Sequence, residues 1–364
     1  MKLAWIVAGV LAAQAALLPA QNHTETVGQA AHLLYPDGHD EAIVANYDEG
    51  HVVLAGVMER VRAYERGLRE PLMETLTRRG VRTIAMNFSA DDAGADTLTH
   101  GQYLWFAEAA DHAWRLTSAA PLLSRVRAVK TATEIARLRA AVRETEDIFQ
   151  SLRGRIRPGM SERQIHALFV GETRRRGHWS GVGESLEGPL TLLPKAGMAH
   201  RGPTDAVLEP GDMLVLDFSV QMAGYSSDVA RTFYCLRPGE TVAPDGALSM
   251  FRASRAATEA ASRVLQPGVR GHEVDQVARD TLRALGYPEP THALGHTVGQ
   301  RAHDGGVLLG PRWERYGSGP DGVVEAGMVF APEPTILPGG PYAVALASVA
   351  PAPTQGDQRA RPKR

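Results

Sequence analysis

The spacing of apolar and polar positions in the first third of the chain predicts a small α/β domain. Segments 42–54 (AIVANYDEGHVVL) and 82–87 (RTIAMN) have the apolar, β-branched composition of strands, whereas 57–79 between them has the apolar spacing of a helix. Segment 97–106 predicts a further strand. Because strands and helices alternate, we expect an α/β domain that covers residues 22–124.

A charged segment at 125–152 predicts the helix that enters a second domain, at 125–350. Thr131 or Thr133 provides an N-cap for this helix, since a threonine hydroxyl can accept a hydrogen bond from the first helical turn. The apolar positions approximate a single helical stripe, which consists of Ile135, Leu138, Val142, Ile148 and Phe149.

An internal repeat indicates that the second domain is duplicated. Residues 156–177 (IRPGMSERQIHALFVGETRRRG) align without gaps on residues 265–286 (LQPGVRGHEVDQVARDTLRALG). In each copy a Pro-Gly turn precedes an amphipathic helix, and a glycine ends that helix. We therefore expect pseudo-two-fold symmetry in the second domain, with a site between its two halves.

Composition and charge narrow the classes of partner. The chain has 364 residues, of which 44% are hydrophobic, and a net charge of -2. These values are typical of two globular domains, and the near-neutral charge argues against nucleic acid or an anionic membrane as the main partner. Cys235 is the only cysteine in the sequence, so there is no disulfide framework, and we expect this thiol to be inert packing.

The two ends of the chain predict segments outside the folded domains. Residues 1–21 (MKLAWIVAGVLAAQAALLPAQ) combine one positive charge, an apolar run and small residues, which is typical of a secretory signal peptide and predicts export to the periplasm or the exterior. The apolar run is short for a membrane span, and an uncleaved anchor or a first helix is the alternative. The Pro-, Arg- and Gln-rich residues 351–364 predict a disordered tail.

Candidate chemistry begins at 216–233 (LDFSVQMAGYSSDVARTF), where a strand-like hairpin carries two aspartates. Strands normally exclude Asp. A two-residue turn at Met222 and Ala223 would place Asp217 and Asp228 directly opposite each other, with Cβ atoms about 5 Å apart. Carboxylates in that arrangement repel each other, which favours a divalent metal pair between them. The alternative is two solvent-facing turn aspartates or a pair that shares a proton.

Further candidate ligands lie downstream and upstream of this hairpin. A Gly-rich stretch at 291–306 (THALGHTVGQRAHDGG) holds three histidines within twelve positions, which favours a ligand or acid–base role. Glu333 follows an apolar strand at 328–331 and is a candidate oxygen ligand. A fourth histidine lies in a polar loop before the strand that carries the first aspartate. These histidines are His200, His292, His296 and His303.

Together these motifs resemble the pita-bread metallopeptidases, a family that includes Xaa-Pro aminopeptidases, prolidases, methionine aminopeptidases and the metal-free creatinases. The shared features are the order Asp, Asp, His, Glu, the eleven-residue spacing of the aspartates, the GY-SD-RT context, the GH-G-H stretch and the GMVF-EP motif, within 125–333. The resemblance implies an α/β (α+β) fold. It also implies that a small creatinase-like N-terminal domain precedes a pseudo-two-fold symmetric pita-bread domain with a curved antiparallel sheet.

Carried over to this chain, the resemblance implies ligands for two divalent metal ions and a peptide pocket. It implies that Asp217 and Asp228 bind the metals, with Asp228 bridging them, and that His296 and Glu333 ligate one of them. The resemblance also implies that the other three histidines, His200, His292 and His303, line the substrate pocket, help to place the peptide carbonyl and shuttle protons. This ligand set suits Mn²⁺, Zn²⁺ or Co²⁺.

The same resemblance implies a metallo-exopeptidase that acts on a peptide with proline at the second position. Relatives are often dimers or larger, so a homo-oligomer is expected. We expect no cofactor beyond the metals and no membrane association after removal of the signal.

The chain departs from the family pattern at the fifth ligand, a bridging Glu on a strand near the C-terminus. The best match is YAVALASVAPAPTQG at 342–356, where Ala347 occupies the Glu position. Without this carboxylate we expect at least one metal to bind more weakly. Three functions therefore stay open: an exported metal-dependent exopeptidase, a non-catalytic peptide-binding homologue, and a metal-free creatinase-like C–N hydrolase. Smaller departures are Ser219, Ala230, Thr297 and Thr335.

Overall fold

The computed structural model describes residues 3–8, 26–180, 189–198, 200–337, 344–345, 347 and 349–352. The chain divides into two compact units, Met1–Val126 and Arg127–Arg364. Within the described residues, none of the helices combines the length and the apolar character needed to cross a membrane.

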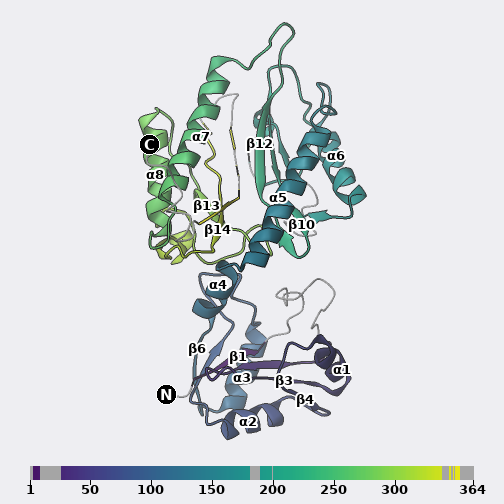
Figure 1. The fold of residues 1–364 in the computed structure, drawn as a ribbon, viewed down its shortest axis with the longest axis vertical. Helices are drawn as coiled ribbons and strands as arrows, with labels where there is room; N and C mark the ends of the chain where they lie inside the picture. Colours follow the sequence, from purple (N-terminus) through teal and green to yellow (C-terminus); the bar gives the residue numbers. More distant parts are fainter. Residues whose placement is uncertain are drawn as a thin grey trace. The chain divides into compact units, whose positions relative to one another are not determined.

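A mixed sheet with the strand order β4-β3-β2-β1-β5-β6 forms the centre of the first unit (Figure 1). Leucine, isoleucine and phenylalanine side chains from the sheet and from two helices form its core, including Leu72, Leu76, Ile84 and Phe106. The strands are β1 (Leu3–Ala8), β2 (Ala31–Leu34), β3 (Asp40–Ala45), β4 (Val61–Tyr64), β5 (Thr83–Met86) and β6 (Arg115–Ser118), and the helices are α1 (Asn46–Ala55), α2 (Arg69–Arg78), α3 (His100–Ala110) and α4 (Ala120–Ala128).

Strand β1 lies within the segment that the sequence predicts to be a signal peptide. It pairs antiparallel with β2 and parallel with β5, so it is an internal strand of the sheet. Cleavage after residue 21 would remove this strand and leave two edges with unpaired backbone groups. Residues 9–21 of the predicted signal lie outside the described residues.

Local structure in the first unit corrects several predictions. The strand predicted at 82–87 is confirmed by β5, but 42–54 contains β3 followed by α1, and 57–79 contains β4 before α2. Segment 97–106 is not a strand, because Thr99 starts helix α3 there. Its hydroxyl accepts a hydrogen bond from the Gln102 backbone N–H, and the Gln102 side chain accepts one from the Thr99 N–H.

In the second unit, all strand pairs within the named sheets are antiparallel, and two pairs of helices cover the strands. Figure 1 shows α5 and α6 beside the strands on one side and α7 and α8 on the other. The helices are α5 (Ala132–Leu152), α6 (Glu162–Arg175), α7 (Asp245–Val264) and α8 (Gly271–Ala284), with short 3-10 turns at Pro194–Ala196, Glu314–Tyr316 and Gly319–Asp321.

Three short sheets make up the strands of this unit, with the orders β11-β10-β7, β12-β9-β8 and β13-β14-β15. The sheets β12-β9-β8 and β13-β14-β15 carry or flank the candidate site residues. The strands are β7 (Trp179–Ser180), β8 (Leu190–Leu192), β9 (Met213–Phe218), β10 (Val220–Met222), β11 (Tyr225–Ser226), β12 (Val229–Tyr234), β13 (Gly295–Thr297), β14 (Val329–Pro332) and β15 (Ala350–Pro351).

The internal repeat is confirmed by helices α6 and α8, whose first and last residues occupy equivalent positions of the two copies. Ile165 and its counterpart Val274 are both completely buried, so the same apolar face is used in each helix. Gly159 and Gly268 both adopt a positive φ in the turn before the helix, which only glycine adopts without strain.

Helix α5 begins after Thr131, which selects the first of the two predicted N-caps. The Thr131 hydroxyl accepts a hydrogen bond from the Glu134 N–H, and the Glu134 carboxylate accepts one from the Thr131 N–H. At the other end of the chain, Pro351 pairs with Val329 of β14 and Ala352 is buried. The rest of the predicted tail, 353–364, lies outside the described residues.

Candidate metal centre

The hairpin that carries the two aspartates turns one residue later than predicted. Ala223 and Gly224 both have positive φ, at 50° and 79°, as a tight two-residue hairpin turn with matching twist requires. Asp217 therefore lies opposite Ala230, and the predicted direct pairing with Asp228 is wrong. Because the register shifts by an even number, Asp228 is a diagonal neighbour of Asp217 on the same face of the hairpin.

Serine hydroxyls replace the regular strand pairing beside these aspartates. The Ser219 hydroxyl donates a hydrogen bond of 2.5 Å to the Ser227 carbonyl, and the Val220 N–H donates one to the Ser227 hydroxyl. That hydroxyl also lies 2.6 Å from the Thr145 hydroxyl on α5. These side chains satisfy buried polar groups where the ladder is interrupted, immediately before Asp228.

The two aspartates lie close enough to perturb each other strongly. Burial and the charge of Glu333 raise the pKa of Asp217 to about 7, although His296 opposes this rise. Burial and the charge of Asp217 hold the pKa of Asp228 well above its usual range. Carboxylates placed in this way are stabilised in their ionised form by a cation between them.

His296 on β13 directs one ring nitrogen toward two carboxylates. Its Nε2 lies 3.4 Å from Asp228 Oδ2 and 3.2 Å from Glu333 Oε1, yet it is buried without a hydrogen bond of good geometry. The other nitrogen, Nδ1, lies 3.1 Å from the Thr297 carbonyl, to which it can donate. In the neutral form of the ring, such a bond leaves the Nε2 lone pair directed between the carboxylates, as metal-ligating histidines require.

Glu333 follows β14, where its backbone N–H donates a hydrogen bond of 2.6 Å to the Leu294 carbonyl. Burial alone would raise the pKa of Glu333, but the interaction with His296 and the nearby His303 and His292 lowers it. Conversely, burial would lower the pKa of His296, whereas Glu333 and Asp228 raise it to about 9. The carboxylates and the imidazole are therefore strongly coupled.

His303 lies beside His296, with 4.0 Å between the ring centroids and an angle of 74° between the planes. One ligand atom from each of Asp228, His296 and His303 can be chosen so that all three lie within 4.8 Å of one another. Loss of hydration and the adjacent His296 lower the pKa of His303 to about 4, so its ring is neutral near pH 7. The structure thus places this histidine close enough to be a ligand as well as a pocket residue.

The residues present fit a divalent metal ion. The orphaned Nε2 of His296 faces two carboxylates, and a third, Asp217, interacts with Asp228. Carboxylate oxygens with neutral imidazole nitrogen form a ligand set that binds Mn²⁺, Co²⁺ or Zn²⁺. The predicted metal ligands Asp217, Asp228, His296 and Glu333 are thus brought together, although their positions in the sequence span three separate motifs.

The remaining two pocket histidines lie on loops near this cluster. His200 is exposed in the loop after the turn at Pro194–Ala196, and its charge contributes to the lowered pKa of His303. The Nδ1 of His292 lies 2.7 Å from the Ala293 carbonyl, and the ring contributes to the lowered pKa of Glu333. Both histidines therefore act electrostatically on members of the candidate centre.

Ala347 lies beside strand β12, which begins directly after Asp228. Its N–H donates a hydrogen bond of 3.4 Å to the Ala230 carbonyl, and its carbonyl accepts one of 3.0 Å from Arg231. The Ala347 side chain is buried in an apolar cluster with Leu192, Val215, Ala230 and Ala345. Position 347 thus adds a methyl group, and no carboxylate, next to the strand that follows Asp228.

Sequence reasoning missed three buried ionic groups that hold the loops of the site. Glu162 binds the loop of His200, Asp275 and Arg279 bind the loop of His292, and Asp304 follows His303. For Glu162 the sequence did contain a signal. The repeat aligns Glu162 with Gly271, so a charged residue in one copy stands where the other copy has glycine at an otherwise equivalent helix start. Asp275 and Arg279 also pair with each other four residues apart on α8, which is a local pattern. Their backbone partners in the loop of His292, and the partners of Asp304, are not revealed by a residue pattern.

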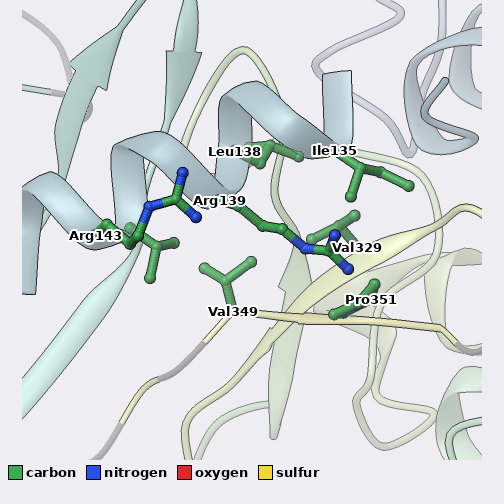
Figure 2. A pocket seen from close by; sticks show the side chains of 8 residues that line it. Ile135, Leu138, Arg139, Arg143, Val329, Val349 and Pro351 are labelled. Atoms are coloured by element: carbon green, nitrogen blue, oxygen red, sulfur yellow. The ribbon is translucent and has the colours of Figure 1, made fainter. Parts of the chain in front are cut away.

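A separate pocket of about 190 Å³ lies between α5 and β14. Arg139 reaches from α5 toward Val329 and Pro351, and Arg143 lies one turn farther along the helix (Figure 2). None of the eight described residues that line it is an Asp, Glu or His, so it is distinct from the candidate metal centre. The other lining residues are Ile135, Leu138, Val142 and Val349.

Comparison with known proteins identifies relatives with the same fold. The Xaa-Pro dipeptidase of Lactobacillus helveticus is 31% identical over 220 residues, which are 60% of this chain and 55% of that protein. The matched region thus spans about half the length of the relative. The Xaa-Pro dipeptidase from Bacillus anthracis superposes with a TM-score of 0.76 at 22% identity, covering 97% of this chain and 90% of that chain.

A crystal structure of the X-Pro aminopeptidase from Thermotoga maritima gives a TM-score of 0.72 at 22% identity, covering 96% of this chain and 93% of the other. These likenesses confirm the predicted fold class. The sequence model of metallopeptidase family M24 matches residues 136–349, which include all four predicted metal ligands. The chain therefore belongs to metallopeptidase family M24.

Proposed function

We propose that this protein is a metal-dependent exopeptidase that hydrolyses Xaa-Pro bonds in dipeptides or short peptides. The observation that carries the proposal is the buried Nε2 of His296, which faces Asp228 and Glu333 without a well-formed hydrogen bond. Membership of family M24 and the similarity to an Xaa-Pro dipeptidase support the reaction class and the substrate. The proline preference rests on that similarity alone.

In this proposal, Asp217, Asp228, His296 and Glu333 hold two divalent ions, Mn²⁺, Zn²⁺ or Co²⁺. Such ions, when bound, activate water as a nucleophile and polarise the scissile carbonyl. The carboxylates supply negative charge that offsets the metals. His296, whose pKa Glu333 and Asp228 raise to about 9, would lose its Nε2 proton when a metal binds there, while its Nδ1 can still donate to the Thr297 carbonyl. The raised pKa values of both aspartates support this assignment, because a bound cation favours their ionised forms.

We assign pocket roles to the three remaining histidines. With its lowered pKa, His303 is neutral near pH 7 and can accept a proton or bind a carbonyl through a donor nitrogen. His200 and His292 approach the same centre from separate loops, so they can hold the two ends of a short peptide. An exopeptidase needs such a pocket because it must recognise a chain terminus as well as the scissile bond.

Activity on matched peptides tests this proposal. The purified protein is incubated with Xaa-Pro dipeptides and tripeptides, with and without added Mn²⁺ or Zn²⁺, and Asp228→Ala serves as the variant. Metal-dependent turnover that Asp228→Ala abolishes is the expected result. No turnover with any of these metals would refute the proposed activity, and turnover that survives a chelator would indicate the metal-free C–N hydrolase.

A non-catalytic peptide-binding protein is the second candidate, and Ala347 is the observation that favours it. This residue places a methyl group in an apolar cluster beside β12, so one carboxylate fewer is available to the metals. Peptide binding without turnover in the metal-loaded wild type, together with turnover in Ala347→Glu, would support this second function. Turnover in the wild type would exclude it.

We also propose export, on the basis of the signal-like sequence 1–21. The internal position of β1 in the sheet argues against cleavage of this segment, because a cleaved chain would lack that strand. N-terminal sequencing of the protein from an exporting host separates the two. A mature N-terminus near residue 22 in the exported fraction is expected, and an intact Met1 in a protein retained inside the cell would contradict export.

A further inference from the structure

A buried ionic cluster lies directly behind His303. The Asp304 side chain, which is 2% exposed, accepts a hydrogen bond of 2.9 Å from Arg127 Nη2 and one of 3.4 Å from Lys130 Nζ. Lys130 is only 1% exposed, whereas Arg127 is 19% exposed. Asp304 therefore joins the loop of His303 to the segment that precedes helix α5.

The space around Asp304 is restricted. A Cβ atom at Gly299 would lie 2.0 Å from Asp304 Oδ2 and 3.1 Å from Lys130 Cε, so only glycine leaves room for the ion pair. Lys130 is itself fixed, because its N–H donates a hydrogen bond of 3.0 Å to the Gly327 carbonyl just before β14. The carboxylate thus occupies a site that is shaped for it on at least two sides.

Backbone contacts tie the same loop to strand β13. The Asp304 N–H donates a hydrogen bond of 3.0 Å to the Thr297 carbonyl, and the Thr297 hydroxyl donates one to the Gly305 carbonyl. These contacts flank His303 on its C-terminal side and hold its ring 4.0 Å from that of His296. The position of the His303 ring therefore depends on where Asp304 is anchored.

Stability alone is a weak reason for such a cluster. The desolvation cost of buried ions can exceed their mutual attraction, and well-packed apolar residues often serve stability equally well. An ion pair with two donors does, however, fix one loop position, because a displaced Asp304 would leave two buried cations without a partner. The cluster is therefore suited to fixing the position of the loop that carries His303.

We propose that Asp304 is a positioning residue for His303, acting through its ion pairs with Lys130 and Arg127. This inference rests on the proposed function, in which His303 lines the peptide pocket. Asp304 itself does not touch the reacting atoms.

The first test requires no turnover. Histidine ring signals are recorded by NMR for the full-length protein labelled in its histidines, and His303→Ala identifies the signal of His303. In Asp304→Asn, which keeps the shape but removes the charge, the His303 signal is expected to shift or broaden. Asp48→Asn is the matched control, because Asp48 is also buried, in the first unit, and accepts hydrogen bonds from Val27 and Gly28.

The second test is a double-mutant cycle on kcat/KM for an Xaa-Pro dipeptide. Misplacement of a pocket residue can cost up to about 100-fold, so Asp304→Asn is expected to lower kcat/KM by roughly 10- to 100-fold. In the His303→Ala background, the same substitution is expected to cost less than about 2-fold, since its effect has already been lost. A purely structural role would give equal losses in both backgrounds.

An unchanged His303 signal in Asp304→Asn, or losses that multiply in the double mutant, would overturn the proposal. If the wild type has no activity, the proposed function fails, and the NMR test alone then decides the role of Asp304. Should Asp304→Asn not fold, Arg127→Gln removes only the more exposed partner. That variant is expected to move the His303 signal in the same direction, and an unmoved signal would likewise overturn the proposal.

Discussion

Glu162 offers a quantitative test of how the loop of His200 is held. Its carboxylate is completely buried at the start of α6 and accepts hydrogen bonds from the backbone N–H groups of Leu193 and Thr204. It also accepts bonds from the Thr204 hydroxyl and from both terminal nitrogens of Arg201. Glu162→Gln keeps the size of the side chain but replaces an acceptor oxygen with a donor NH₂ group.

The expected magnitude follows from the pKa of this group. Burial alone would raise the pKa of Glu162, but Arg201, Leu193 and Thr204 lower it from 4.5 to about 2. A change of this size corresponds to roughly 3 kcal/mol, because one pKa unit is worth about 1.4 kcal/mol. Since the folded-state pKa lies below the unfolded one, this stabilisation is present above pH 4.5 and is lost as the pH falls toward 2.

Thermal unfolding of the wild type and of Glu162→Gln, measured from pH 7 to pH 3, provides the assay. A loss of 3 kcal/mol is expected to lower Tm by roughly 6–12 °C at pH 7, with the difference shrinking below pH 4.5. The control is Glu259→Gln on α7, where the half-exposed carboxylate accepts a hydrogen bond from Arg255 four residues earlier, so that the bond lost is largely screened by solvent.

A smaller loss is therefore expected in Glu259→Gln. A Tm difference between wild type and Glu162→Gln that does not depend on pH would refute the reasoning. So would a loss in the control as large as that in Glu162→Gln at pH 7.

Three other predictions concern the apolar cluster, a second anchored loop and the first strand. Ala347→Glu should lower the Tm of the metal-free protein, because a carboxylate enters an apolar cluster, and added Mn²⁺ should restore it; an unchanged Tm in both states would contradict this. Asp275→Asn should raise KM more than it lowers kcat, because Asp275 and Arg279 hold the loop of His292; equal changes would argue against it. A chain that starts at residue 22 should show a lower Tm than the full chain, since β1 is internal.

Much of the second unit could be predicted because its signals are local and repeated. The Pro-Gly turns and the matching apolar faces predict α6 and α8, and Thr131 with Glu134 predicts the start of α5. The meeting of Asp217 with His296 and Glu333 also follows from motif order, once the resemblance is recognised. The register of the hairpin that carries Asp217 and Asp228 does not follow, because a shift of the turn by one residue changes a direct pairing of the two aspartates into a diagonal one.

The first unit and the buried ionic clusters could not be predicted in the same way. Segment 97–106 has apolar and aromatic residues typical of a strand, and only the Thr99–Gln102 capping pair indicates a helix. Lys130 and Asp304 lie 174 positions apart, so no local pattern joins them. The position of β1 depends on pairing with β2 and β5, which the signal-like composition of that segment conceals.

Metal content is the most direct test of the central claim that Asp217, Asp228, His296 and Glu333 form a divalent metal site. The protein is loaded with Mn²⁺ or Zn²⁺, dialysed, and analysed by inductively coupled plasma mass spectrometry beside His296→Ala. The account predicts retained metal in the wild type and a clear loss in His296→Ala, whose Nε2 faces two of the carboxylates. Equal metal content in the two proteins, or none in the wild type, would contradict it.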